Sequence, residues 1–499
     1  MSDNTCLNTR KDEPQFGYSF RVTPPDSNSL IDHSLLIDPS LDAAKDLPDR
    51  VVINITEPVV FEEPSGGFKI ETPDGITICL HERFPGENGG FDRSDPNYRF
   101  IDDVVYNSEL TELYFCPRNK TSIKLPDTVK VIAEYAFDGC TKIENIVLPD
   151  GLISICKCAF NACTNLRSIF IPKSVNCIEN FAFLYCDKLT EIIVDNANPY
   201  FSSKDEVLYS KETGWLIYCN TNKEHLILPE GIKDIYVKCF EKCNGMKKIT
   251  LPSSLKYICF WSSDNSCTDL TDIIVDENNP CYSSYDGVLY NKNNTELIRC
   301  PKAKEAIHVS DRVKNIGVLS FFCCRNIKTV ILPEGLESID KWAFKRCIAL
   351  ENVLLPDTLN GIGGISFWSC YKLESVNIPR NVKNLHPSAF NWCINLKEIN
   401  ISEQNPVYKA VDGIVYSKDM SEFIHCPSGK ESAVILDNTK KVGSYAFCGG
   451  KKLKSIYIPD SVEEIDPKFL QAVYELKHIS VPTRLAEVVI KALLDNEYK

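Results

Sequence analysis

The chain has 499 residues, a formal net charge of -13 and 43% hydrophobic residues. The acidic balance argues against a general affinity for nucleic acid, and no run of 18 apolar residues predicts a transmembrane segment. The opening "MSDNTCLNTRKDEPQFGYSF" has no apolar run behind a basic end, so no secretory signal is expected. These features predict a cytoplasmic protein whose 23 cysteines are reduced thiols.

Two segments precede the repetitive part of the chain. Residues 1–48 are polar and contain Pro, Asp and Ser, which predicts a disordered N-terminal segment. Residues 49–94 hold the strand-like sequences "RVVINI" and "GITICL" among Pro and Gly. This pattern predicts a β-rich N-terminal cap or small domain.

An element of 23 residues occurs four times, starting at Asp95, Asn198, Asn279 and Asn405. The copy "NPCYSSYDGVLYNKNNTELIRCP" shows its pattern. Counted from the proline, every copy has an Asp at +6, a Tyr at +10 and a Cys at +20. Two apolar stretches flank a polar turn, which predicts a β-hairpin packed on its neighbours.

A second repeat restarts about every 23 residues, as in "LPDTVKVIAEYAFDGCTKIENIV" from Leu125. Its β-branched tail ends at a proline and predicts one strand, whereas "AEYAFDGC" predicts one or two turns of helix. Neither element can bury its apolar side alone, so the units are expected to stack into a solenoid. The eleven predicted unit starts are Leu125, Leu148, Ile171, Leu228, Leu251, Val309, Leu332, Leu355, Ile378, Leu436 and Ile458.

The chain ends with "PTRLAEVVIKALLDNEYK", residues 482–499. Leu485, Val488, Val489 and Leu493 follow helical spacing there. We therefore predict a C-terminal helix that caps the solenoid, because a terminal coil would otherwise expose its core.

The pattern L/I-P-x-x-V/L-x-x-I-x-x-x-A-F-x-x-C, together with the "NPxYSSxDGVLY" insertions, resembles the BspA-type leucine-rich repeat over roughly residues 95–481. The resemblance implies an α/β leucine-rich-repeat solenoid. It would have a parallel β-sheet face, short helical or turn segments on the other side, and β-hairpin insertions. It also implies a binding protein, since many members look like surface adhesins that attach to host or neighbouring-cell proteins.

Cysteine recurs at one position of nine units, which we interpret as a core position that suits a small, weakly polar thiol. No Cys-x-x-Cys pair occurs, and one Asp per insertion cannot supply a calcium site, so no metal or cofactor is predicted. His425 beside Cys426 could suggest a catalytic pair, but the other insertions do not repeat it. The nine cysteines are Cys140, Cys163, Cys186, Cys243, Cys267, Cys324, Cys347, Cys370 and Cys393.

Two positions of each predicted strand should point away from the core. The first is polar in every unit, and the second is largely apolar. The apolar row is either a protein-binding patch or a product of β-propensity with partial cover by the hairpins. We take it as the candidate partner-binding surface, formed by Val147, Phe170, Ile193, Ile274, Ile331, Leu354 and Tyr457.

The sequence therefore predicts a non-enzymatic scaffold that binds a protein partner through the open sheet face. One alternative is a cell-surface adhesin that leaves the cell by an unconventional route. Another, of a different class, is an enzymatic or regulatory domain within residues 1–94, which contain His33, His81, Cys6 and Cys79 but no spaced motif.

Overall fold

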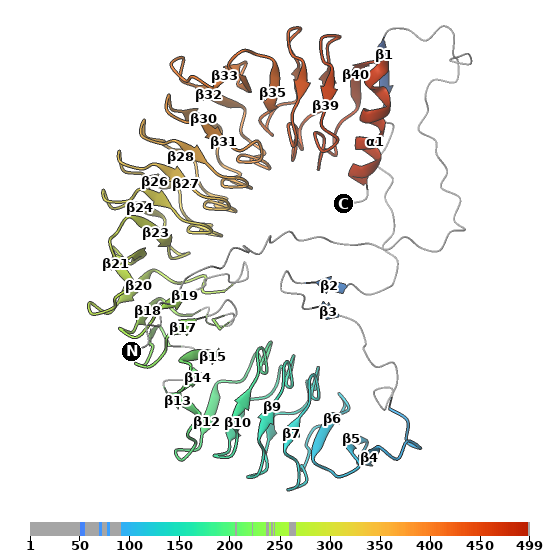
Figure 1. Cartoon of the computed structure of the whole chain (residues 1–499), viewed down its shortest axis with the longest axis vertical. Coiled ribbons are helices and arrows are strands. Elements are labelled where there is room, and N and C mark those ends of the chain that lie inside the picture. The colour runs from blue at the N-terminus through green and yellow to red at the C-terminus, as the bar shows by residue number, and fades with distance from the viewer. Residues whose placement is uncertain are drawn as a thin grey trace, which may run out of the picture.

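The computed structural model describes residues 50–54, 69–71, 77–79 and 91–497, apart from 205–206, 222, 236–238, 241–242, 244 and 259–265. Its coils stack into an arc that is open on one side (Figure 1). The predicted disordered segment 1–48 lies outside the described residues.

Each coil contributes one strand to an outer ladder of parallel strands, which lies toward the outer side of the arc (Figure 1). Paired residues are 23 positions apart, or 24 between β18 and β20. The ladder is interrupted at the insertions and once more between Val353 and Ser375, which leaves separate parallel sheets. Its strands are β8 (Asn145–Ile146), β10 (Ser168–Ile171), β12 (Glu191–Val194), β16 (His225–Ile227), β18 (Lys248–Leu251), β20 (Asp272–Val275), β24 (Ala306–His308), β26 (Thr329–Ile331), β28 (Asn352–Val353), β30 (Ser375–Ile378), β32 (Glu398–Ile401), β36 (Ser432–Val434), β38 (Ser455–Tyr457) and β40 (His478–Pro482).

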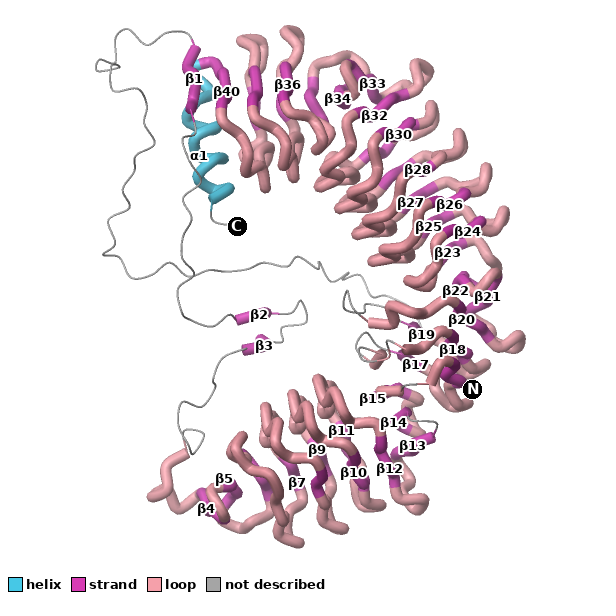
Figure 2. The backbone as a smooth tube through the Cα atoms, turned by 180° about the vertical axis from the view of Figure 1, so that it is seen from behind, coloured by secondary structure: helices cyan, strands magenta, loops and turns pink. Residues whose placement is uncertain are grey.

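Where neither an insertion nor the C-terminal helix follows, a turn leads from the outer strand to a two-residue strand of an inner ladder, which lies closer to the hollow of the arc (Figure 2). This turn contains a proline except after the strands that end at His308 and Val434. These strands also pair in parallel at intervals of 23 residues. The inner strands are β7 (Val131–Ile132), β9 (Ser154–Ile155), β11 (Cys177–Ile178), β17 (Asp234–Ile235), β19 (Tyr257–Ile258), β25 (Asn315–Ile316), β27 (Ser338–Ile339), β29 (Gly361–Ile362), β31 (Asn384–Leu385), β37 (Lys441–Val442) and β39 (Glu464–Ile465).

The predicted helical segments of the repeat, and with them the α/β class, are wrong: where the structure describes the Ala-Phe segment of a coil, it is a run of turns. Tyr135 and Gly139, which flank Phe137, both have positive φ (60° and 69°), a conformation that a right-handed helix excludes. The Phe137 N–H donates to the Ala159 carbonyl of the next coil at 2.8 Å instead of closing a helical turn. The fold is therefore a β-solenoid, and helix in the described residues is confined to η1 (Thr483–Leu485) and α1 (Ala486–Glu497).

The core consists of ladders of identical side chains. Phe137 and Phe160 stack with ring centroids 4.9 Å apart and planes 9° apart, and Phe344 and Phe367 stack in the same way at 4.9 Å and 6°. All four rings are fully buried. Such ladders let coils that cannot bury their apolar side alone share a core with their neighbours, and the described residues form four core clusters along the solenoid.

Each insertion forms a three-stranded antiparallel unit, one strand more than the predicted hairpin. In two insertions the turn aspartate, Asp286 or Asp412, and the glycine that follows it both have positive φ. This is the geometry of a tight hairpin turn. The third strand pairs in parallel with the next inner strand, so the insertion starts a new block of coils. The strands are β4 (Tyr98–Ile101), β5 (Val104–Asn107), β6 (Glu112–Phe115), β13 (Phe201–Lys204), β14 (Val207–Ser210), β15 (Trp215–Cys219), β21 (Tyr282–Tyr285), β22 (Val288–Asn291), β23 (Glu296–Arg299), β33 (Tyr408–Val411), β34 (Ile414–Ser417) and β35 (Glu422–His425).

A buried asparagine fixes each later insertion to the coil before it. The Asn405 side chain donates to the carbonyls of Pro379 (3.1 Å) and Val382 (2.9 Å) and accepts from the N–H groups of Val407 (2.9 Å) and Tyr408 (2.8 Å). Asn198 and Asn279 make the same four bonds in their insertions. The Asn of the Asn-Pro pair is thus an anchor that satisfies all its polar atoms inside the core.

The C-terminal coil is covered by two elements. Leu485 and the helix residues Val489 and Ala492 are buried in the last core cluster, so α1 packs on the end of the solenoid. The N-terminal strand β1 (Arg50–Asn54) pairs antiparallel with β40, the last outer strand, over five residues. The remaining described strands, β2 (Lys69–Glu71) and β3 (Thr77–Cys79), form a separate antiparallel pair.

Candidate functional site

The outer ladder presents a row of exposed apolar side chains. Within β10, Ile169 and Ile171 point into the core while Phe170 between them is 42% exposed. Alternation along a strand therefore fixes which residue faces outward, and the parallel register brings Phe170 beside Val147 and Ile193. Val147 and Leu354 are the most exposed members, at 80% and 78%. All seven predicted row residues are exposed: Val147, Phe170, Ile193, Ile274, Ile331, Leu354 and Tyr457.

The ladder also contains row positions that sequence reasoning missed. Ile227 pairs with Thr250, and Val434 pairs with Tyr457; both Ile227 and Val434 are exposed. They lie on strands that directly follow an insertion, and each could have been found by counting 23 residues back from the next row residue. The pairing of Val434 with Tyr457 also moves the start of that unit from the predicted Leu436 to Ile435.

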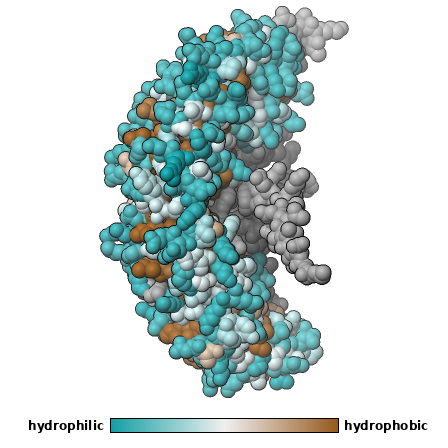
Figure 3. Space-filling model, turned by 60° about the vertical axis from the view of Figure 1, so that its left-hand side comes forward, coloured by the Kyte–Doolittle hydropathy of each residue, from teal (hydrophilic) through white to brown (hydrophobic). Residues whose placement is uncertain are grey.

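The apolar row has polar interruptions. Lys124 and His308 occupy row positions beside Val147 and Ile331. Farther along, Asn377 and Asn400 occupy the row and hydrogen bond to each other at 3.2 Å. Figure 3 shows hydrophobic patches spaced along the outer side of the arc between hydrophilic side chains. The row is therefore a series of exposed apolar side chains that polar side chains interrupt.

The cysteine ladder has a structural role. Cys347 is fully buried, and its thiol donates to the Phe321 carbonyl of the preceding coil at 3.1 Å. Cys163, Cys186 and Cys393 make the same contact with the Phe carbonyl one coil earlier. A buried carbonyl thus gains a weak donor that fits the space left beside the phenylalanine stack.

His425 and Cys426 do not form a catalytic pair. The Cys426 thiol points to the Pro427 carbonyl at 3.8 Å, and burial raises its pKa to about 12. Burial lowers the pKa of His425 to about 4, and neither ring nitrogen has a hydrogen-bond partner among the described residues. A neutral histidine beside a protonated thiol lacks an activated nucleophile. Across the described part of the chain, no group of three or more His, Cys, Asp or Glu side chains is arranged to hold a metal.

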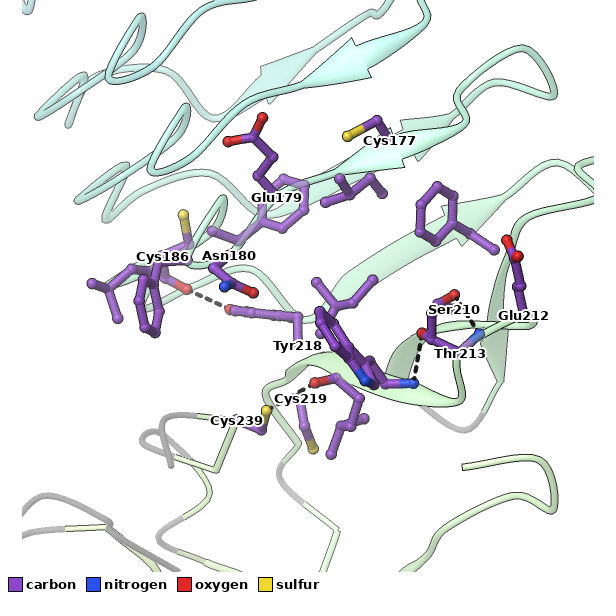
Figure 4. A pocket seen from close by; sticks show the side chains of 18 of the residues that line it. Cys177, Glu179, Asn180, Cys186, Ser210, Glu212, Thr213, Tyr218, Cys219 and Cys239 are labelled. Carbon is purple, nitrogen blue, oxygen red and sulfur yellow. Dashed lines mark hydrogen bonds between the residues drawn. The ribbon is translucent and has the colours of Figure 1, made fainter. Parts of the chain in front are cut away.

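A pocket that was not predicted from the sequence lies where the first internal insertion meets the coil before it (Figure 4). Its volume is about 270 Å³. Apolar and aromatic side chains of β11, β13, β15 and the turn at residues 181–185 line it, and Glu179 and Glu212 stand at its edge. The Tyr218 hydroxyl on its wall donates to the Cys186 carbonyl at 2.9 Å, which ties the insertion to that coil.

No helix within the described residues is long and apolar enough to cross a membrane.

Stacked parallel strands, ladders of Leu, Ile and Phe, and proline turns at 23-residue intervals define the class of leucine-rich-repeat solenoids. A family model of the BspA type leucine rich repeat region matches residues 108–205, 212–310, 299–410 and 418–496. The chain belongs to the BspA-type leucine-rich-repeat family, as its repeat pattern predicted.

Two solved structures with a similar repeat come from bacteria. A leucine-rich repeat protein from Eubacterium ventriosum is 19% identical, covering 75% of this chain and 92% of its own, with a TM-score of 0.45. A leucine rich cell surface protein from Faecalibacterium prausnitzii is 18% identical over 78% of this chain and 94% of its own, with a TM-score of 0.41. The search of curated proteins found no match.

Proposed function

We propose that this protein is a non-enzymatic scaffold that binds a protein partner through the outer face of its solenoid. The observation that carries the proposal is the register-aligned row of exposed apolar side chains on the outer ladder. Burial of one such side chain against a partner stabilises a complex by roughly 1–2 kcal/mol, so several of them support a specific interface. The net charge of -13 supports a protein partner over nucleic acid.

The polar row beside it supplies directional contacts. Ser168 donates to Asn145 at 3.0 Å, which holds both side chains in place on the sheet. An apolar row bordered by ordered polar groups resembles the core and rim of a protein interface. The bound partner would lie across several coils, because neighbouring row residues belong to different strands.

The test is capture of partners from lysate by the full chain and by Phe170→Glu/Ile331→Glu. Because both side chains point to solvent, the double variant should keep its melting temperature while it loses most of the captured protein. The matched control is Ser168→Glu/Thr329→Glu, which adds the same charges to the same two strands at the polar row. Unchanged capture by a folded Phe170→Glu/Ile331→Glu variant contradicts the proposal, and equal loss by the control variant assigns the effect to charge.

We also propose that the protein works in the cytoplasm, which is supported by the many free thiols that serve as donors in its core. Protease shaving of intact native cells checks this, followed by a thiol count on the recovered protein. Protection from the protease is the expected result. Cleavage on intact cells would favour the alternative of a surface adhesin.

A further inference from the structure

Each internal insertion packs against the last strand of an inner ladder. Two insertions place a tyrosine hydroxyl on the backbone of that strand, and one does not. At β31 the Tyr408 hydroxyl accepts from the Leu385 N–H at 3.1 Å and donates to the Lys383 carbonyl at 3.2 Å. At β19 the Tyr282 hydroxyl donates to the Lys256 carbonyl at 3.1 Å and bonds to the backbone of Ile258. A phenol hydroxyl thus closes the edge at both places, because it both donates and accepts.

At β11 the residue in the same position of the insertion is Phe201, which has no hydroxyl. By repeat position, the Asn176 carbonyl corresponds to those of Lys256 and Lys383, and the Ile178 N–H corresponds to those of Ile258 and Leu385. Neither backbone group has a hydrogen-bond partner within the described residues. The first junction therefore retains a donor and an acceptor spaced for one hydroxyl.

The pocket of Figure 4 lies at this edge, with Asn176, Ile178 and Phe201 in its wall. Ile178 is half-buried, whereas the corresponding Ile155 and Ile339 are 0% and 1% exposed. The pocket is therefore a local opening in an otherwise closed core. At about 270 Å³ it is smaller than the sites of roughly 300–1,000 Å³ that hold drug-sized ligands, so it suits a single-ring compound.

The lining and the edge of the pocket indicate which other groups a ligand should carry. Trp215, Ile217 and Phe201 give the pocket an apolar lining that suits an aromatic ring. Glu179 and Glu212 contribute negative charge at the edge, and no Lys or Arg is present among the described lining residues. A cationic group on the ligand would meet complementary charge there.

We propose that this pocket binds a small phenol carrying an ammonium group, with the phenol hydroxyl on the Ile178 N–H and the Asn176 carbonyl. The ring lies between Ile178, Phe201 and Trp215, and the ammonium group faces Glu212. The ligand then supplies the hydroxyl that Tyr282 and Tyr408 supply at the other two junctions.

The probe for the test is tyramine, titrated into the full chain by calorimetry and ligand-observed NMR. A ligand of this size should bind in the range of roughly 0.1–1 mM. Phenethylamine, which lacks the hydroxyl, should bind about tenfold more weakly because two backbone groups stay unpaired. The anion 4-hydroxyphenylacetate should bind several-fold more weakly than tyramine. Equal affinity for tyramine and phenethylamine, or no tyramine binding below about 5 mM, overturns the proposal.

The decisive variant is Phe201→Tyr, which installs the residue found at the corresponding positions 98, 282 and 408. It should fold with an unchanged or higher melting temperature and lose tyramine binding by at least about tenfold. Tyr282→Phe changes a different junction and should leave the affinity as in the unaltered chain. Glu212→Gln should weaken tyramine about threefold without affecting 4-ethylphenol, because the exposed charge acts only on the cation. Tyramine binding by Phe201→Tyr within twofold of the unaltered chain contradicts the assigned site.

Discussion

Removal of the buried anchor of an insertion should cost more than any single change on the surface. In Asn405→Ala, the Pro379 and Val382 carbonyls lose their donor, and the Val407 and Tyr408 N–H groups lose their acceptor. Asn405 is 0% exposed, so water cannot readily replace the amide. At about 1 kcal/mol for each buried group left unpaired, we expect a loss of about 4 kcal/mol.

Hydrogen exchange measured by mass spectrometry is the appropriate assay, because a solenoid opens in blocks and need not unfold in one step. Peptides covering 379–385 and 405–417 should lose protection by a factor of roughly 10²–10³, which corresponds to about 3–4 kcal/mol, while peptides of the first coils stay protected. A loss of less than tenfold in these peptides would refute the reasoning.

Two exchanges between asparagine and aspartate provide controls for this anchor. Asn405→Asp keeps the acceptor oxygen but places a carboxylate next to two carbonyl oxygens. At neutral pH it should therefore lower the stability of the insertion at least as much as Asn405→Ala. Asp95→Asn should change stability by less than about 0.5 kcal/mol. Asp95 starts the first insertion, no coil precedes it among the described residues, and its side chain only accepts, from Asn97.

Three further predictions concern the core. Cys347→Ala should lower the free energy of unfolding by about 1–2 kcal/mol in guanidinium denaturation, because a buried thiol and its bond to Phe321 are lost. The pKa of His425 is about 4 in the folded chain against about 6.5 unfolded, so the unfolded state binds more protons between these values. Stability should fall by about 3 kcal/mol as the pH drops from about 6.5 to about 4, and His425→Phe should flatten that part of the stability–pH curve. Rapid thiol labelling of the native protein, mapped by mass spectrometry, should reach Cys156, Cys177 and the other half-buried thiols among the described cysteines and leave ladder thiols such as Cys347 unlabelled until the chain is denatured.

The 23-residue spacing predicted the outer strands, the stacking and the outward row because all three depend only on periodicity. The pattern predicted one strand per unit, so the two-residue strands of the inner ladder were missed. Ile169 is buried and Phe170 exposed because successive side chains of a strand point to opposite faces of the sheet. The neighbouring coils repeat this alternation in the same register. The helical interpretation of the Ala-Phe segment failed because it rested on composition, which is compatible with a helix but does not require one. The neighbouring coil decides instead, since Phe137 donates to Ala159 across coils and leaves no N–H for a helical bond.

The junctions could not be predicted in this way, because their contacts join elements that repeat with different periods. The Asn of the Asn-Pro pair was visible in sequence, but its partners Pro379 and Val382 belong to the preceding coil and become neighbours only after stacking. Departures from the repeat are therefore most informative at junctions. Asp95 stands in place of Asn where the described residues include no preceding coil whose carbonyls would need a donor, so that substitution has a structural explanation. Phe201 replaces Tyr where the edge groups of β11 are present, so two backbone groups there have no hydrogen-bond partner among the described residues, and the pocket lies at that place.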